Sequence, residues 1–198
     1  MRNFVTLFCL YFLVSCSVTS QEINSISKEE KTIWESFKLV PSSANLQMTN
    51  DKEPGEKLIL CITFIDKLKK TPLENQKVLL YQTSNDGNYN PEIAGNEKTA
   101  RIRGEGYTDG KGRMYVNTIL PGSYATSGDN RHIHTQVFGA KPQAYDMHFA
   151  QYTNARMKRF IEERDQFFLV DLKYTVDKKL IGFVTIEVKK PKKTTKHD

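Results

Sequence analysis

The segment RIRGEGYTDGKGRMYVNTILPGS, residues 101–123, decides the fold of this chain. It contains two short apolar runs with strand character, 101–107 and 114–119. The turn residues DGKG separate the two runs, and LPGS follows the second. Clusters of Gly, Asp, Pro and Ser mark turns between regular elements. The segment therefore predicts short strands joined by turns.

The same pattern extends over most of the chain. Further strand-like runs cover residues 58–66, 77–83, 133–138, 147–152, 167–174 and 181–188. Many short strands with turns between them predict an all-β fold, an antiparallel β-sandwich. Only KEEKTIWESF, residues 28–37, and TNARMKRFIEERD, residues 153–165, suggest one or two short helices.

Two histidines in RHIH, His132 and His134, lie two positions apart in a strand-like run. Side chains of a strand alternate between its faces, so both imidazoles point to one side and Ile133 to the other. Two imidazoles aimed at one point suit a metal ion. Histidines on a surface, or with their hydrogen bonds satisfied elsewhere, give the same pattern.

Two tyrosines, Tyr89 and Tyr124, add donors that suit ferric iron. Phenolate oxygen is a hard anionic donor with a free pKa of about 10, so a strong positive charge is needed to keep it ionised. A cupin-like site would place a Glu where Phe138 stands, and a ferrous facial triad would have to use Asp129. Taken singly, each tyrosine also fits an ordinary strand-end aromatic.

Residues 72–137 resemble the intradiol ring-cleavage dioxygenases, which include the catechol and protocatechuate enzymes. The matching stretches are VLLYQT followed by NDGNY, GYTDGKGRMYVNTILPGSY, and RHIH. The resemblance implies a transthyretin-like (prealbumin-like) sandwich. It also implies a non-haem Fe(III) ion bound by Tyr89, Tyr124, His132 and His134.

The resemblance further implies the reaction. A catechol-type aromatic diol would be cleaved by O2 to a muconate-type diacid, an oxidoreductase step of aromatic compound catabolism. Tyr124 would be the ligand that leaves and takes a proton from the diol. Tyr89 and both histidines would stay in place.

Two positions near the histidines bear on this match. Members of the family carry an Arg three residues before the first histidine, where this chain has Asp129, whereas Arg131 directly precedes His132. On a regular strand, Arg131 would face away from the ligands, but a bulge or a turn would let it reach the substrate as a catalytic residue. His148 lies near a Gln of the family, and is either a group beside the iron or a strand-end histidine.

The N-terminal segment predicts the location. Arg2 and the apolar run FVTLFCLYFLVS have the form of a signal peptide, residues 1–15, and LVSC resembles a bacterial lipobox. Cys16 would then carry a lipid and tether the protein to the bacterial cell envelope, in the periplasm or at the outer membrane. Secretory cleavage near Ser20 is the alternative. Cys61 is the only cysteine beyond this segment, so no internal disulfide is expected.

The division of the rest of the chain into segments is predicted from its composition. We expect a tether and lead-in at residues 16–57, the sandwich at 58–188 and a basic disordered tail at 189–198. Much of the net charge of +6 comes from the tail. No nucleic-acid motif accompanies the tail, so we expect no nucleic-acid partner. A non-catalytic envelope lipoprotein of the same fold, which binds a ligand or a partner, is the alternative function.

Overall fold

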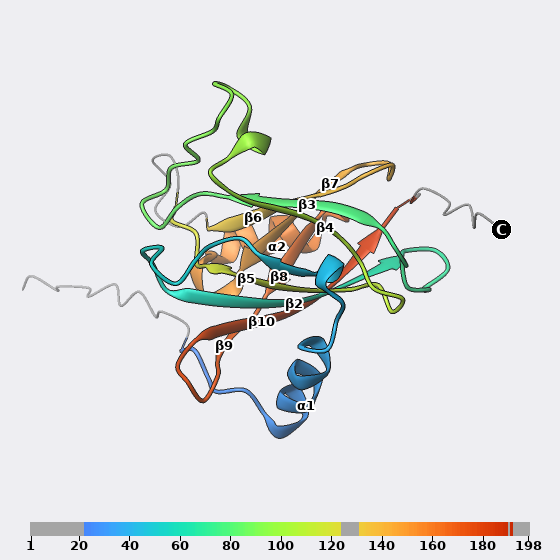
Figure 1. The fold of residues 1–198 in the computed structure, drawn as a ribbon, viewed down its shortest axis with the longest axis horizontal. Helices are drawn as coiled ribbons and strands as arrows, with labels where there is room; N and C mark the ends of the chain where they lie inside the picture. The colour runs from blue at the N-terminus through green and yellow to red at the C-terminus, as the bar shows by residue number, and fades with distance from the viewer. Residues whose placement is uncertain (1–21, 124–130, 190, 192–198) are drawn as a thin grey trace, which may run out of the picture.

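Two five-stranded β-sheets face each other in the computed structural model, which describes residues 22–123, 131–189 and 191 (Figure 1). The strands are β1 (Asn45–Gln47), β2 (Lys57–Asp66), β3 (Lys77–Gln82), β4 (Ile102–Tyr107), β5 (Arg113–Ile119), β6 (His132–Val137), β7 (Ala144–Phe149), β8 (Phe167–Val170), β9 (Leu172–Tyr174) and β10 (Leu180–Val188). The helices are α1 (Lys28–Phe37) and α2 (Ala155–Glu162), with 3₁₀ turns η1 (Ser42–Ala44), η2 (Glu97–Thr99) and η3 (Ala150–Tyr152).

The first sheet has the order β1-β5-β2-β10-β9 and the second the order β4-β3-β6-β7-β8. The prediction of a mostly β fold with two sheets and few helices is confirmed. The predicted antiparallel pairing holds for only part of the sandwich, because β1 pairs with β5, β10 with β2, and β8 with β7 in parallel. Each of these pairs joins segments far apart in the sequence, and local turn signals carry no information about such pairing.

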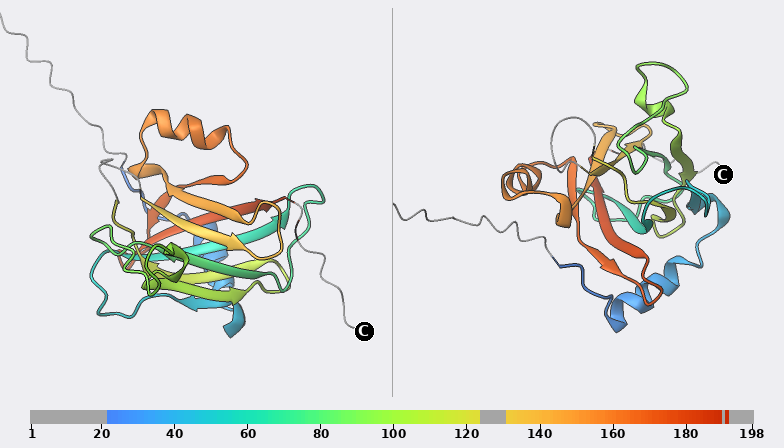
Figure 2. Two further views of the ribbon diagram at one scale, coloured as in Figure 1. Left: turned by 90° about the horizontal axis from the view of Figure 1, so that it is seen from above. Right: turned by 90° about the vertical axis from the view of Figure 1, so that its left-hand side faces the viewer.

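The core lies between the two sheets, and Figure 2 shows the two layers from two further sides. Strand β3 alternates buried and half-buried residues, so Val78 and Leu80 point into the core and Tyr81 points out. Strand β2 is buried along most of its length because its outer face is covered as well. There α1 packs on Ile59 and Cys61, and Trp34 donates a hydrogen bond from Nε1 to the Tyr115 hydroxyl at 3.2 Å.

Helix α1 has the predicted bounds, and a capping box at its N-terminus explains where it begins. The Ser27 side chain accepts a hydrogen bond from the Glu30 amide, and the Glu30 carboxylate accepts one from the Ser27 amide. This arrangement satisfies backbone donors that the helix itself leaves unpaired. Helix α2 begins after Asn154, whose side chain accepts from the Met157 amide.

Four strands differ from the predictions. Strand β7 covers 144–149, and the predicted end of that run, 150–152, is the 3₁₀ turn η3. The run 167–174 is divided into β8 and β9, which belong to different sheets. The chain changes sheet beside Asp171, where the Gln151 amide group bonds both backbone polar groups of Leu172. Strand β1 was not predicted and lies within the expected lead-in.

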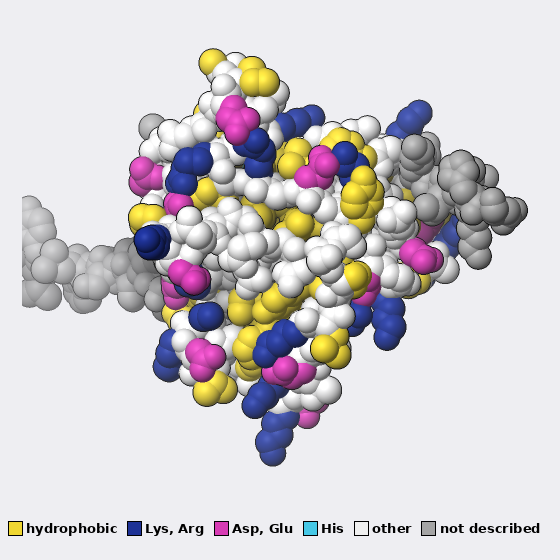
Figure 3. All heavy atoms as spheres, in the orientation of Figure 1, with side chains coloured by type: hydrophobic (Ala, Val, Ile, Leu, Met, Phe, Trp, Pro, Cys, Tyr) yellow, Lys and Arg dark blue, Asp and Glu magenta, His cyan; other side chains and the backbone are white. Residues whose placement is uncertain are grey.

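The predicted signal peptide and Cys16 lie outside the described residues, as does nearly all of the basic tail. The domain boundaries stay predictions. Within residues 22–123, 131–189 and 191, no helix is both long enough and apolar enough to cross a membrane. On the face in Figure 3, Lys and Arg side chains are interspersed with Asp and Glu.

Candidate metal centre

The predicted histidines lie on the outer face of the second sheet. In β6, Ile133 and Val137 belong to the core, so His132 and His134 point to the opposite side. Both imidazoles therefore share one face, as the HxH spacing predicts.

The neighbouring strands bring further polar and aromatic groups to this face. The β6–β7 register places His148 opposite His132 and Asp146 opposite His134. On the other side, β3 places Tyr81 opposite His134. Residues directly opposite each other in an antiparallel pair have their Cβ atoms about 5 Å apart, so these side chains are within contact distance.

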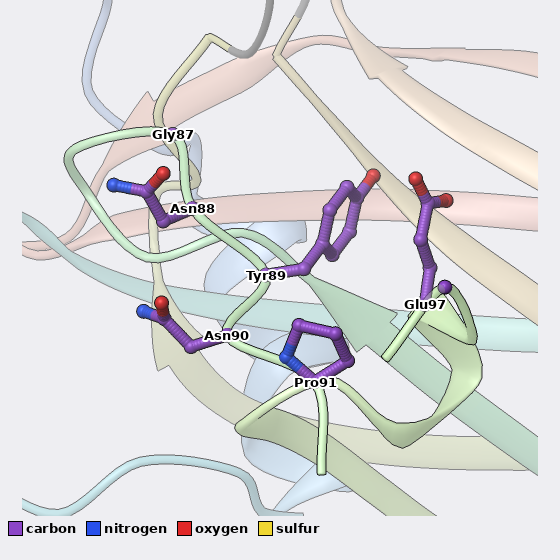
Figure 4. Close-up of a pocket in the computed structure, with 7 residues that line it drawn as sticks. Gly87, Asn88, Tyr89, Asn90, Pro91 and Glu97 are labelled. Carbon is purple, nitrogen blue, oxygen red and sulfur yellow. The ribbon is translucent and has the colours of Figure 1, made fainter. Parts of the chain in front are cut away.

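Tyr89 approaches from the loop that follows β3. The loop turns sharply at Gly87, whose φ is 83°, and the Ser84 amide donates to the Asn88 carbonyl. The Tyr89 carbonyl accepts a hydrogen bond from the Arg101 amide at 2.9 Å, which ties the loop to the start of β4. Figure 4 shows the Tyr89 ring rising from the loop, with the Glu97 side chain beside it. Both residues line a pocket of about 510 Å³.

Two of the predicted donor atoms lie close to a third, His134 Nε2. The Tyr89 hydroxyl lies 2.9 Å from His134 Nε2, and His132 Nε2 lies 3.1 Å from the same atom. First-row metal ions bind imidazole nitrogen and oxygen at about 2.1 Å, and right angles between such bonds place the donors about 3 Å apart. The spacing of these donors therefore fits a single transition-metal ion.

The opposite side of the His134 ring contacts a carboxylate. Asp146 Oδ1 lies 2.9 Å from His134 Nδ1. An ionised carboxylate can only accept a hydrogen bond, so Nδ1 must donate, and the lone pair of the neutral ring is then on Nε2. The protonation pattern leaves Nε2 ready to bind a cation. The 3.1 Å contact between the two Nε2 atoms is compatible with a hydrogen bond from His132 to His134 in the metal-free protein, and with binding of both atoms to one cation.

Sequence reasoning missed Asp146. The available signal was the alternation DxH in YDMHF, residues 145–149, beside HxH in β6. His132, His134 and Asp146 can each offer a ligand atom within 4.8 Å of the others, so these three also form a possible metal-binding group.

Aromatic rings surround the donors. Tyr81 stacks on His134 with centroids 4.7 Å apart, and His148 stacks on His132 at 4.9 Å. Phe167 of β8 meets His148 edge-on, and Phe160 of α2 stacks on Phe167. Figure 2 shows α2 beside this edge of the sheet. Burial lowers the pKa of His148, and it outweighs the opposing effect of Asp146.

The structure describes only one of the other predicted site residues. Tyr124 and Asp129 lie outside the described residues. Arg131 directly precedes β6, and its guanidinium lies over the Tyr152 ring at 4.3 Å. Its Nε is buried and has no hydrogen-bond partner in the described part of the chain. The catalytic role of Arg131 stays a prediction.

Comparison with known families identifies the chain. A family model described as Dioxygenase matches residues 39–197, which is most of the sequence. The chain belongs to the intradiol ring-cleavage dioxygenase family. The expectation for Tyr89, Tyr124, His132 and His134 was based on this family, whose members have two tyrosines and two histidines in this pattern. A comparison with curated protein sequences gives no match.

Solved structures agree with the family at the level of the fold. Similar structures include the dioxygenase domain of a dioxygenase and carbohydrate-binding protein fusion from Streptomyces sp. SirexAA-E, an intradiol ring-cleavage dioxygenase from Tetranychus urticae and a catechol 1,2-dioxygenase from Pseudomonas arvilla C-1. Their identities to this chain are 18%, 17% and 15%, and their TM-scores are 0.51, 0.52 and 0.57. The alignments cover 75%, 77% and 76% of this chain, and 90%, 88% and 58% of those chains.

Proposed function

We propose that this protein is a non-haem Fe(III) intradiol dioxygenase that cleaves a catechol-type aromatic diol with O2 to a muconate-type diacid. The convergence of the Tyr89 hydroxyl and the Nε2 atoms of His132 and His134, in a chain of this family, carries the proposal. The transthyretin-like topology remains the prediction made from the family.

The described residues supply three of the four proposed ligands. Tyr89, His132 and His134 come from a loop and a strand that neighbouring strands hold in place. Bound there, Fe(III) would act as a Lewis acid and as a template for the diol and O2. Phenolate is a donor that iron accepts and that a trivalent cation keeps ionised.

The substrate-facing roles extend this proposal to two further residues. A diol that binds through both oxygens must lose its two protons, and Tyr124 is proposed to take one of them as a phenolate, while hydroxide would take the other. Arg131 is proposed to face the bound diol, since its buried Nε offers a donor for an anionic oxygen. The aromatic rings of Tyr81 and Phe167 near the histidines suit a flat aromatic substrate.

The test uses the purified full-length chain in detergent, loaded with iron. We expect a broad visible band from phenolate bound to ferric iron, a shift of this band when catechol is added, and oxygen uptake with formation of a muconate-type diacid. Tyr89→Phe removes one phenolate. We expect it to weaken the band and to lower the rate of oxygen uptake by about 100-fold or more, since even groups beside a metal ligand affect activity by about 10–100-fold.

The control is Tyr107→Phe, which alters a tyrosine that is 40% exposed on β4 and takes no part in the site. It should keep both the band and the activity. An iron-loaded protein without the band would contradict the phenolate ligands. A coloured protein that consumes no oxygen with any catechol would instead support the non-catalytic binding protein.

We also propose that Cys16 carries a lipid and anchors the protein in the bacterial cell envelope. The support for this proposal is the order of a basic residue, an apolar run and LVSC at residues 13–16. An aromatic diol, O2 and a membrane are thus the proposed partners.

A further inference from the structure

We propose that Asp146 is a positioning residue that holds His134 in the ring orientation and tautomer needed to bind the metal. The inference rests on the proposed function, because it concerns the same metal centre. It assigns a role to a residue outside the expected set of two tyrosines and two histidines. The carboxylate would act through His134 and would not touch the ion.

The strand register places Asp146 opposite His134 and keeps it there. Its neighbours in β7, Tyr145 and Met147, are fully buried in the core. A shift of β7 by one residue would turn both of these side chains out and Asp146 in, at a large cost in buried apolar surface. The Asp146 amide also donates to the Gln166 carbonyl at 2.8 Å on the far side of β7. The backbone that carries the carboxylate is thus held between two strands.

The contact with His134 is a hydrogen bond with partly shielded partners. The distance from Nδ1 to Oδ1 is 2.9 Å, and the two side chains are 17% and 19% exposed. A hydrogen bond to an ionised acceptor is stronger than one between neutral groups. It selects the tautomer with hydrogen on Nδ1, which leaves the lone pair of the neutral ring on Nε2. Carboxylates that bind metal-bound histidines in this way are frequent beside metal ions in proteins.

The geometry favours this positioning role over a direct ligand role for Asp146. Its oxygen lies on the Nδ1 side of the His134 ring, whereas Tyr89 and His132 approach Nε2 on the other side. An ion bound to Nε2 at about 2.1 Å has the imidazole ring between it and the carboxylate. One ion cannot bind Nε2 and this oxygen together in the observed arrangement.

The residues opposite the two histidines differ in chemistry. The residue opposite His132 is His148, whose ring stacks on it at a centroid distance of 4.9 Å. A stacked ring restricts the plane of an imidazole but does not choose its tautomer. Asp146 does both for His134, so we expect its loss to affect the metal site through His134.

The experiment compares Asp146→Ala and Asp146→Asn with the unchanged full-length chain. The asparagine keeps an oxygen that can accept from Nδ1 and loses the charge, and the alanine loses both. The matched control is Asp177→Ala, which removes an exposed carboxylate in the turn between β9 and β10 of the first sheet. Two measurements are made: the tautomer of His134 in metal-free protein, by long-range ¹H–¹⁵N NMR, and the retention of iron against a chelator, followed by the visible band.

We expect hydrogen on Nδ1 of His134 in the unchanged chain, in Asp146→Asn and in the control. We expect a mixture of tautomers in Asp146→Ala. Iron affinity should fall by about 10–100-fold in Asp146→Ala and by less in Asp146→Asn. With excess iron, the band of Asp146→Ala should return, because Tyr89 is still present.

Two outcomes would overturn the inference. One is an unchanged His134 tautomer and unchanged iron affinity in Asp146→Ala. The other is a complete loss of iron binding in Asp146→Ala and Asp146→Asn together with an unaffected Tyr89→Phe, which would make the carboxylate a direct ligand. The NMR measurement needs no metal. It therefore tests the role of Asp146 even if the unchanged chain binds no iron, a result that would defeat the proposed function alone.

Discussion

At the scale of single residues, Asp109 is an instructive case, because it organises the turn between β4 and β5. Its carboxylate accepts hydrogen bonds from the amides of Lys111 and Arg113 at 2.9 Å and 2.8 Å, and from Arg113 Nε at 2.8 Å. Burial works against the charge of Asp109, but the hydrogen bonds from Arg113 and Lys111 outweigh it and lower the pKa of Asp109. The aspartate of the DGKG pattern thus has a structural role in this chain, which is to hold the turn between β4 and β5.

Asp109→Asn should therefore destabilise the fold in a manner that depends on pH. The native pKa is below the ordinary value of 3.8, so the carboxylate contributes stability above that value. This contribution is lost as the pH falls through the native pKa. We expect the substitution to cost about 2 kcal/mol at pH 7, with a smaller difference from the unchanged chain in acid.

Urea unfolding followed by circular dichroism, at neutral pH and at acidic pH, measures this difference. Asp51→Asn is the control, since Asp51 is an exposed carboxylate in a surface turn. A difference that stays constant down to strongly acidic pH would show that the charge of Asp109 contributes nothing to stability.

At the scale of elements, the strands with clear turn residues at their ends were predictable. Strands β2, β3, β4, β5, β6 and β10 lie within one residue of their predicted bounds. The division of the run 167–174 into β8 and β9 was not predictable, because a side chain from elsewhere contacts the backbone at that point. Gln151 bonds the Leu172 backbone where the chain passes from one sheet to the other, and no local pattern announces that contact.

Prediction of the metal centre from the sequence was limited in the same way. Spacing alone placed His132 and His134 on one face, and the resemblance added Tyr89. Asp146 could not be assigned, because its position opposite His134 depends on the register between β6 and β7. That register is determined by the path of residues 138–143, where the Val137 amide bonds the Gln143 carbonyl and Gly139 has a φ of 79°.

A contact between elements of the two sheets gives a second prediction. Gly182 of β10 faces Val170 of β8, and a Cβ added to Gly182 would lie 2.5 Å from Val170 Cγ1 and 3.2 Å from Leu60 Cδ2. Gly182→Ala forces the sheets apart locally, and overpacking of this kind costs about 1–3 kcal/mol. Thermal and urea unfolding should both show the loss.

Gly110→Ala serves as the control for Gly182→Ala. A Cβ at Gly110 would meet only Glu74 Oε1, at 3.8 Å, which is an ordinary contact. If the two substitutions changed stability equally, the close approach of the sheets at Gly182 would not be the cause.

At the scale of the whole molecule, the sequence predicted two layers of short strands but not how distant strands pair. Strand β2 pairs with β10 along nine residues in parallel, from Leu58 with Leu180 to Asp66 with Val188. Turn chemistry predicts contacts between neighbours in sequence, and these two strands are separated by residues 67–179. The parallel pairs are therefore the part of the architecture that required the structure.

The location of the whole protein is open to a direct test through Cys16. We expect the unchanged chain, expressed in a bacterial host, to fractionate with membranes and to carry acyl chains on its mature N-terminus, because buried acyl chains retain a protein at a bilayer. Cys16→Ser should lack this modification, as mass spectrometry would reveal.

Cys9→Ser changes a cysteine of the same segment that is not at the expected cleavage site, and it should remain acylated. A mature chain that begins near Ser20 without acyl chains would contradict the lipid anchor.

The position of β10 has a consequence for synthesis on the ribosome. Strand β10 is an interior strand of the first sheet, between β2 and β9. The backbone groups of β2 that face β10 cannot be paired until residues 180–188 have been translated. Until then β2 has an open apolar edge, and such edges favour aggregation. Nascent chains that stall after β9 should therefore be vulnerable to proteolysis, whereas completed chains close the sheet.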